Sequence, residues 1–358
     1  MDRLSKVRSL AATRARKAVE LVSIPVYIMT SAINDYEIKK YFTKNNYFGY
    51  PDKDVIFFEQ GLEPCLSLDE KLIIESSNSL AMAPDGNGGI YYAMRKTGQL
   101  EDMTNRGVKH LHIYGIDNVL TKSADPLFIG ACIERNVEVG NKIVWRANKS
   151  EKVGTTVTVG GKMKIIEYSE IPRELAEAED ENGKLIFGAA NICNHYLSVN
   201  FLVSLIPRLQ TFYHLAVKKI PFYDPISKRV TTPDKPNGVK LEMFIFDVFP
   251  HADRWLVTEV DREDEFAPVK NAPGASSDSP DTARDLIFKQ AKKWLEKAGA
   301  NVRVATAEDS VGEIGAAISY CGEGLEDFAG KVVSTPFCIL SKDDSLAPSG
   351  TACSCSIM

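Results

Sequence analysis

The 358 residues are enough for one large α/β domain and a smaller one, and 44% hydrophobic and 25% charged residues are typical of a globular protein. The formal net charge of -5 argues against a nucleic-acid partner, because a duplex-binding protein needs a concentrated excess of Lys and Arg to displace counterions. Seven cysteines without a CxxC pair indicate neither a disulfide framework nor a zinc site and predict a cytoplasmic location, and no apolar stretch approaches the roughly 18 residues of a membrane span.

The first part of the chain alternates between helical and strand-like patterns. Residues 1–23 are expected to form an N-terminal amphipathic helix, because apolar residues recur there at helical spacing. Short apolar runs at 24–31, 55–58, 111–116 and 143–145 predict buried strands, and helical patterns follow at 35–42, 89–94 and 126–135. Such alternation predicts an α/β fold with a mostly parallel, doubly wound, Rossmann-like sheet over residues 24–300.

The second part adds further strands at 163–168, 241–249 and 255–260 and a helix at 199–209. Ser279 and Pro280 predict the start of a long helix as its N-cap and first residue, and Gly299 predicts its end. Short β-like runs with glycine then predict a small C-terminal β domain at 301–342, followed by a flexible tail at 343–358.

The segment Met-Ala-Pro-Asp-Gly-Asn-Gly-Gly at 82–89 is the most informative motif. It precedes a helical pattern and offers backbone amides without a Cβ in the way, as a loop that approaches a nucleotide needs. A Gly/Asn turn that only caps a helix would have the same composition. It is not a Walker loop, because the Gly-Lys-Ser/Thr ending is absent.

Several motifs occur together in one order along the chain. Phe57-Phe58-Glu59-Gln60-Gly61 and the 82–89 segment resemble the uridine-binding region of eukaryotic UDP-N-acetylglucosamine pyrophosphorylases. The resemblance extends from about residue 25 to about residue 327 through the segments YGIDN (114–118), ADP (124–126), IEYSEI (166–171), NICNH (191–195), PDKPNG (233–238) and REDEF (262–266).

The resemblance implies an enzyme, a nucleotidyltransferase that joins UTP to N-acetylglucosamine 1-phosphate and gives UDP-N-acetylglucosamine and pyrophosphate, with Mg²⁺ as cofactor. Phosphoryl transfer of this kind requires positioning and charge neutralisation rather than a protein nucleophile. The five histidines, which show no triad or metal spacing, are therefore expected to be structural.

For the nucleotide, the resemblance implies that Gln60 meets the uracil edge, that Gly86 lets the backbone reach the base and that Asn87 forms hydrogen bonds to the sugar hydroxyl groups or the nucleotide. It places Mg²⁺ and the ribose-phosphate region at Asp117, whose carboxylate is a hard oxygen ligand. From the residues alone, Gln60 and Asn87 could instead stabilise turns, and Asp117 could cap the following helix.

For the sugar, the resemblance implies close backbone approach at Gly154, hydrogen bonds to hydroxyl groups at Glu167 beside Tyr168, and an amide contact between Asn191 and the N-acetyl group. The family usually has glycine where this chain has Ala190. Lys240 and Lys270 match phosphate-facing catalytic lysines, although most lysines are simply solvated surface charges.

Two further features depart from the family pattern. Family members begin with a strand and a glycine-rich loop followed by lysine, whereas the first glycine here is Gly49. The sequence therefore also allows an incomplete chain that catalyses poorly, a non-catalytic nucleotide-sugar-binding paralogue, or a pyrophosphorylase for another UDP-sugar. The C-terminal residues around Cys353 and Cys355 resemble a prenylation signal, but a frayed tail is the preferred interpretation.

Overall fold

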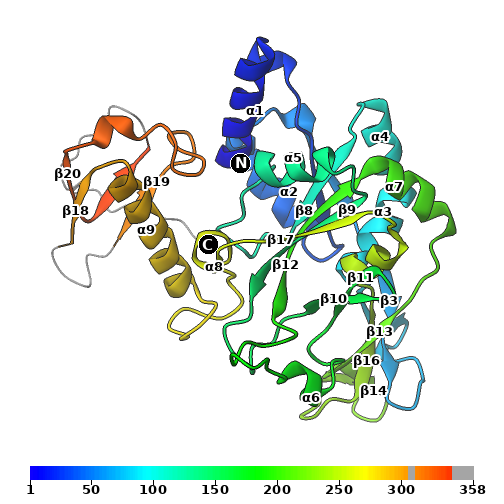
Figure 1. Cartoon of the computed structure of the whole chain (residues 1–358). Helices are drawn as coiled ribbons and strands as arrows, with labels where there is room; N and C mark the ends of the chain where they lie inside the picture. Colours follow the sequence, from blue (N-terminus) through cyan, green and yellow to red (C-terminus); the bar gives the residue numbers. More distant parts are fainter. Residues whose placement is uncertain (305–310, 341–358) are drawn as a thin grey trace.

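The computed structural model describes residues 1–304 and 311–340; the predicted tail and both Cys353 and Cys355 lie outside these residues. Helices and strands alternate through most of the chain, which confirms an α/β fold (Figure 1). Within the described residues, no helix has the length and apolar character needed to cross a membrane.

The N-terminal elements form the first layer. Helix α1 (Asp2–Ala15) ends at Arg16 in the left-handed conformation, and strand β1 (Val26–Thr30), helix α2 (Asp35–Lys44) and strand β2 (Val55–Glu59) follow. β1 and β2 pair in parallel, as the βαβ pattern of the sequence predicts. The amide of Gln60 donates to the carbonyl of Thr30 at 2.9 Å, and the carbonyl of Gly61 accepts from the amide of Asp85 at 3.2 Å, so the chain after β2 lies beside the glycine-rich segment.

The central sheet is mixed rather than mostly parallel. Its strand order is β11 (Lys162–Ile166), β10 (Thr155–Val159), β12 (Ala189–Ser198), β9 (Val139–Trp145) and β17 (Trp255–Glu259), and β8 (His110–Tyr114) also pairs with β12. Only β9 and β17 pair in parallel in this sheet. The sequence patterns did not predict β12, which runs antiparallel between β8 and β9, and this strand is the physical reason why the expected parallel pairing is not confirmed.

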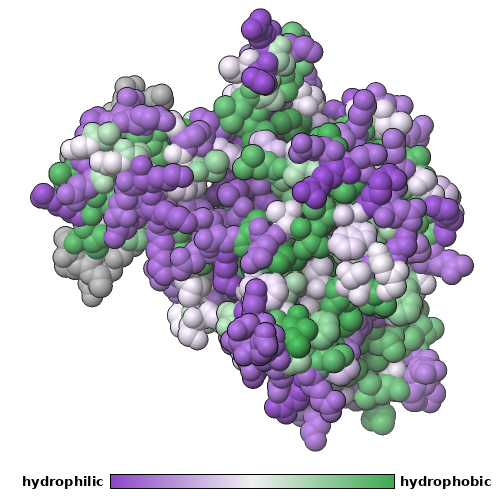
Figure 2. All heavy atoms as spheres, in the orientation of Figure 1, coloured by the Kyte–Doolittle hydropathy of each residue, from purple (hydrophilic) through white to green (hydrophobic). Residues whose placement is uncertain are grey.

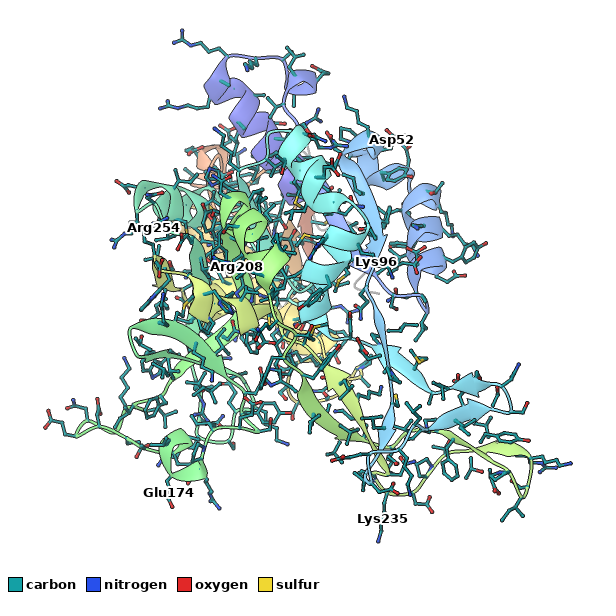
Figure 3. The ribbon with its side chains drawn as sticks, turned by 90° about the vertical axis from the view of Figure 1, so that its right-hand side faces the viewer. Asp52, Lys96, Glu174, Arg208, Lys235 and Arg254 are labelled. Atoms are coloured by element: carbon teal, nitrogen blue, oxygen red, sulfur yellow. The ribbon has the colours of Figure 1, made fainter. Side chains whose placement is uncertain are left out.

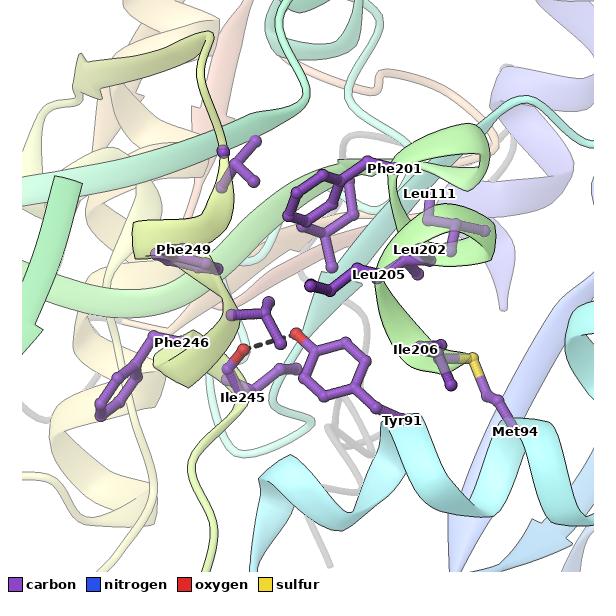
Figure 4. Packing of buried hydrophobic residues seen from close by; sticks show 14 of the residues in the cluster. Tyr91, Met94, Leu111, Phe201, Leu202, Leu205, Ile206, Ile245, Phe246 and Phe249 are labelled. Carbon is purple, nitrogen blue, oxygen red and sulfur yellow. Dashed lines mark hydrogen bonds between the residues drawn. The ribbon is translucent and has the colours of Figure 1, made fainter. Parts of the chain in front are cut away.

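Helices cover this sheet and carry its main core. They are α3 (Ile90–Lys96), α4 (Gln99–Asn105), α5 (Pro126–Glu134) and α7 (Val199–Leu205), whereas the four-residue α6 (Arg173–Ala176) has no buried residue and does not contribute to this core. Tyr91 and Met94 of α3 pack against the Leu202 and Leu205 side of α7, and the hydroxyl group of Tyr91 donates to the carbonyl of Ile245 (Figure 4). This packing fixes the start of α3, directly after the glycine-rich segment.

The run at 241–249 is not a strand as predicted. β16 (Gly238–Glu242) ends early, and Ile245–His251 forms the 3-10 helix η6, whose buried Ile245, Phe246 and Phe249 face the core. A continuous apolar run fits a buried helix as well as a buried strand, so periodicity alone did not separate the two.

Small antiparallel pairings complete the lower part of the molecule. β13 (His214–Lys218), β16 and β4 (Leu66–Ser67) form a three-stranded sheet. The two-stranded pairs are β3 (Leu62–Pro64) with β7 (Met82–Pro84), β5 (Ile74–Ser76) with β6 (Ser79–Leu80), and β14 (Phe222–Asp224) with β15 (Arg229–Thr231). Exposed apolar side chains of β13, such as Leu215 and Val217, contribute to this part of the surface, where Figure 2 shows apolar groups.

Two arms extend from the body in Figure 3, one ending near Glu174 and the other near Lys235. The first arm contains α6, beyond the end of β11, and the second contains β13 and β16. We call them the Glu174 arm and the Lys235 arm.

The C-terminal part packs around one long helix. Helix α9 (Pro280–Lys297) starts as predicted, because the hydroxyl group of Ser279 accepts from the amide of Thr282, and the chain turns at Gly299 with φ of 90°. Its Phe288 and Leu295 pack with residues from β18 (Asn301–Arg303), β19 (Gly312–Ile314), β20 (Val332–Ser334) and β21 (Phe337–Ile339). Short helix α8 (Arg262–Glu265) precedes α9.

Candidate functional site

The glycine-rich segment is fixed against the residues that join β16 to η6. The amide of Gly88 donates to the carbonyl of Met243 at 2.9 Å, and the side-chain oxygen of Asn87 accepts from the amide of Ile245 at 2.9 Å. A Cβ on Gly86 would lie 2.4 Å from the Met243 carbonyl oxygen, and Gly86 has φ of 84°, which favours glycine. The loop conformation therefore depends on glycine, and the Asn87 side chain has a structural role beside any contact with a nucleotide.

Asp85 connects this segment to the chain after β2. Its side chain is 4% exposed, and a Cβ on either Gly61 or Gly89 would lie within 2.5 Å of its carboxylate. Burial raises the pKa of Asp85 to about 6, while amides, including that of Gly61, partly oppose the shift. Gly61, which follows Gln60, and the glycine-rich segment thus both pack against the Asp85 carboxylate. The sequence predicts Asp85 only as a residue of the glycine-rich loop, because its burial depends on tertiary packing.

Asp117 lies just after β8, as the sequence predicts. Its carboxylate is 3.9 Å from the Nζ of Lys270, both side chains are substantially exposed, and its carbonyl accepts from the amide of Val269 at 2.9 Å. Two residues far apart in the sequence therefore present opposite charges at one place.

The donor set around Asp117 suits a partly hydrated cation rather than a protein cage. Among the described residues, no group of three or more His, Cys, Asp or Glu side chains is arranged to hold a metal ion. Mg²⁺ commonly takes one or two carboxylates and completes its shell with phosphate oxygens and water. The exposed Asp117 carboxylate fits that requirement as a single protein ligand.

A bulge in β12 shapes the neighbouring surface. The register of β12 against β9 shifts between Asn191 and His195, and Cys193 within the bulge has φ of 50°. The side-chain oxygen of Asn191 accepts from the amide of Cys193 at 3.2 Å, and Asn191 is 7% exposed. Burial raises the pKa of Cys193 to about 11, and the negative charge of nearby Asp117 adds to the shift. Asn191 therefore lies close to the Asp117 end of β8.

Ala190 and Gly154 lie side by side with this bulge. Ala190 is fully buried among Val144, Ile192 and Phe266, so its methyl group is accommodated in the core. The carbonyl of Gly154 accepts from the amide of Asn191 at 2.8 Å. A Cβ on Gly154 would lie 2.9 Å from a methyl carbon of Ile165 and 3.0 Å from the Glu167 carboxylate, so a larger residue there would require these side chains to shift.

The pKa of Glu167 is shifted by several of the surrounding charged residues. Burial raises its pKa, as does the charge of Glu170, whereas His214 and Lys270 act in the opposite direction. Lys270 therefore influences both Glu167 and Cys193. These links bring Asp117, Gly154, Glu167, Asn191 and Lys270 into one neighbourhood, and Tyr168 follows Glu167 with its side chain half exposed. We call these six residues the bulge cluster.

Four predicted residues lie outside the bulge cluster: Gly86 and Asn87 belong to the glycine-rich segment described above, and Lys240 and Gln60 have other surroundings. Lys240 lies on β16 opposite Ala216, and its charge lowers the pKa of Cys65 against the raising effect of burial, which places it beside the core of the Lys235 arm. Gln60 is half-buried at the end of β2. The contacts described above do not join either residue to the bulge cluster.

His214, which the sequence predicts to be structural like the other histidines, contacts two carboxylates in the structure. Its Nδ1 is 2.7 Å from the carboxylate of Glu170 and its Nε2 is 3.0 Å from that of Asp247. Because these partners are 44 and 33 residues away in the chain, no local spacing could have revealed the arrangement.

Similar proteins were found by sequence and by structure. A yeast (Saccharomyces cerevisiae) UDP-N-acetylglucosamine pyrophosphorylase is 41% identical over 95% of this chain and 73% of its own length. A UDP-N-acetylhexosamine pyrophosphorylase-like protein 1 from Xenopus tropicalis is 40% identical over 97% of this chain and 71% of its own length. The crystal structure of a candidate UDP-N-acetylglucosamine pyrophosphorylase from Entamoeba histolytica matches with a TM-score of 0.87 and 33% identity, covering 95% of this chain and 83% of that one.

The family model described as UTP–glucose-1-phosphate uridylyltransferase matches residues 9–306, which is most of the chain. The motif order, the fold and the relatives agree with this match. The chain therefore belongs to the UTP–glucose-1-phosphate uridylyltransferase family.

Proposed function

We propose that the protein is a UDP-N-acetylglucosamine pyrophosphorylase that transfers the uridylyl group of UTP to N-acetylglucosamine 1-phosphate. A phosphate oxygen of the sugar phosphate attacks the α-phosphorus of UTP, and the bond to the bridging oxygen breaks so that pyrophosphate leaves. The proposal is supported above all by the bulge cluster, where Asp117, Lys270, Glu167 and Asn191 meet, together with relatives of that name.

The cluster offers a distinct task for each side chain. Lys270 would neutralise negative charge that develops as pyrophosphate departs, because a fixed ammonium group stabilises such charge without reorganisation. Glu167 and Tyr168 would accept or donate hydrogen bonds to sugar hydroxyl groups, and Asn191 would contact the acetamido group. We also propose that Gln60, Gly86 and Asn87 contact uridine and that Lys240 faces phosphate, as the family resemblance implies.

Asp117 would hold Mg²⁺ in this proposal. When bound, the ion would supply positive charge that neutralises phosphate oxygens and orients the triphosphate. Asp117 itself would contribute one carboxylate oxygen, while Lys270 at 3.9 Å limits the net negative charge of the site.

The proposal also covers the topology of the sheet and the location of the protein in the cell. The parallel pairs β1–β2, which α2 connects, and β9–β17 support a doubly wound nucleotidyltransferase arrangement around the antiparallel β12. The five cysteines within the described residues are free, which is consistent with a cytoplasmic location.

The test measures Mg²⁺-dependent pyrophosphate release from UTP and N-acetylglucosamine 1-phosphate, with glucose 1-phosphate as the competing substrate. We expect turnover that prefers the acetamido sugar. Lys270→Ala should lower kcat roughly 100-fold, whereas Lys289→Ala, at an exposed residue of α9, should leave it unchanged. Activity that is unchanged in Lys270→Ala would contradict the proposal, and so would equal activity with glucose 1-phosphate and N-acetylglucosamine 1-phosphate.

A further inference from the structure

A charged bridge connects the two arms of the molecule. His214 begins β13 on the Lys235 arm, and Glu170 lies just beyond β11 on the Glu174 arm (Figure 3). Their side chains meet at 2.7 Å, and the second imidazole nitrogen is 3.0 Å from Asp247 of η6. One side chain therefore joins three segments that are far apart in the sequence.

The bridge has a defined charge state. A neutral imidazole has one N–H donor, so it can donate to only one of two carboxylates, whereas the protonated ring donates to both. Burial lowers the pKa of His214, but the hydrogen bonds to Glu170 and Asp247 outweigh burial, and its pKa is raised. The ring also lies against Phe244, with centroids 4.2 Å apart, which fixes its plane.

The two ends of the bridge differ in how firmly they are held. Asp247 also accepts from the amide of Phe244 at 2.7 Å, so η6 keeps an anchor without His214. The Glu170 carboxylate is 45% exposed, and its backbone amide closes a turn onto the carbonyl of Glu167 at 2.9 Å. Loss of the bridge should therefore release the segment that carries Glu167 and Tyr168 more than the segment that holds Gly86 and Asn87.

We propose that His214 is a positioning residue that holds the sugar-facing segment 167–170 against η6 and thereby sets affinity for the sugar phosphate. This inference rests on the proposed function for the identity of the ligand. The charged groups facing His214 are Glu170 and Asp247, and Glu167 lies within its electrostatic reach. The bridge is complete while His214 is protonated and weakens as the pH rises through its pKa.

The first experiment needs no substrate. Amide hydrogen exchange is compared between the wild-type protein, His214→Ala, and His251→Ala, which removes an exposed histidine at the end of η6. We expect faster exchange at Glu170 and Ile171 in His214→Ala, little change at Asp247, and a wild-type pattern in His251→Ala. Unchanged exchange at Glu170 and Ile171, or equal loosening throughout the protein, would overturn the proposal whether or not the protein turns over.

The second experiment measures KM for each substrate across pH 6 to 9. We expect His214→Ala and Glu170→Gln to raise KM for N-acetylglucosamine 1-phosphate by about 10-fold, the effect of losing one charged hydrogen bond, with kcat and KM for UTP nearly unchanged. The wild-type KM should rise with pH and the KM of His214→Ala should not. Equal increases in both KM values would overturn the proposal, whereas wild-type protein without turnover would contradict only the proposed function.

Discussion

Asp85 is a carboxylate that the fold buries between two glycines. Its ordinary pKa would be 3.8, and burial raises it to about 6. Folding therefore takes up a proton between these two values, and the contribution of Asp85 to stability falls as pH rises through this window. The protein keeps this unfavourable group at the point where the chain after Gln60 meets the glycine-rich segment, which indicates that position rather than stability is its role.

We therefore predict that Asp85→Asn becomes progressively more stable relative to the wild-type protein as the pH rises from about 4 to about 6. Above that range the difference should reach a plateau, because the wild-type carboxylate is then charged in both the folded and unfolded states. Urea unfolding at a series of pH values measures the difference. A difference that is constant with pH would show that Asp85 is not the titrating group.

At the scale of elements, local chemistry predicted helix boundaries better than strand pairing. Ser279, Pro280 and Gly299 predicted α9, because capping depends on neighbouring residues. β12 was missed because its polar Asn191, Asn194 and His195 do not resemble a buried strand, although all three are buried in the structure. Their burial depends on partners in other elements, such as Asn141 for His195 and His112 for Asn194.

In the candidate site, too, features that depend on local sequence are predicted, and features that depend on contacts between distant segments are not. The end of β8 and the position of Asp117 follow from an apolar run, so the sequence predicts them. The approach of Lys270 to Asp117 and the bridge at His214 depend on how distant segments pack, which no single sequence pattern contains. The ligand contacts of all these residues stay predictions.

The contact between the glycine-rich segment and η6 provides a prediction about these elements. Gly86→Ala adds a Cβ that would lie 2.4 Å from the carbonyl of Met243 at a residue with φ of 84°. We expect destabilisation on the order of 3 kcal/mol, because backbone strain adds to overpacking. Gly160→Ala is the matched control, since Gly160 has φ of 57° but no atom within 4 Å of the added Cβ. Chemical unfolding of both variants separates the effect of backbone strain from the effect of the steric clash. Equal losses in the free energy of unfolding would mean that the backbone at Met243 shifts at little cost.

At the scale of the whole molecule, polar contacts connect the terminal parts to the centre. Lys6 of α1 donates to the carbonyls of Ala317 and Ile318, and the hydroxyl group of Tyr320 donates to Ser123 near α5. Arg3 reaches the carbonyl of Thr121 in the same region. The N-terminal helix and the C-terminal part are therefore attached to one segment, the chain that leads from Asp117 to α5.

A buried ion network lies next to that segment. Lys142 of β9 has a side chain 1% exposed and forms ion pairs with Asp125, which caps α5, and with Glu265 of α8. Glu265 also pairs with Lys122 at 2.9 Å. A sheet strand and two helices thus share one set of charges, and each charge is satisfied only while all three elements are in place.

Removal of Lys142 leaves two carboxylates in the interior without their main cation. We predict that Lys142→Ala lowers the free energy of unfolding by about 3–5 kcal/mol, the usual cost of removing one partner from a buried ion pair. The matched control is Lys162→Ala, because Lys162 pairs with Asp253 at the surface and such pairs contribute little. Urea unfolding at pH 7.5 measures both. If the two lysine variants lose equal stability, the buried network does not hold β9, α5 and α8 together. If Lys142→Ala alone is destabilised, lowering the pH should reduce the difference in unfolding free energy between this variant and the wild-type protein. The reason is that protonation neutralises the carboxylates of Asp125 and Glu265, which have lost their main cation.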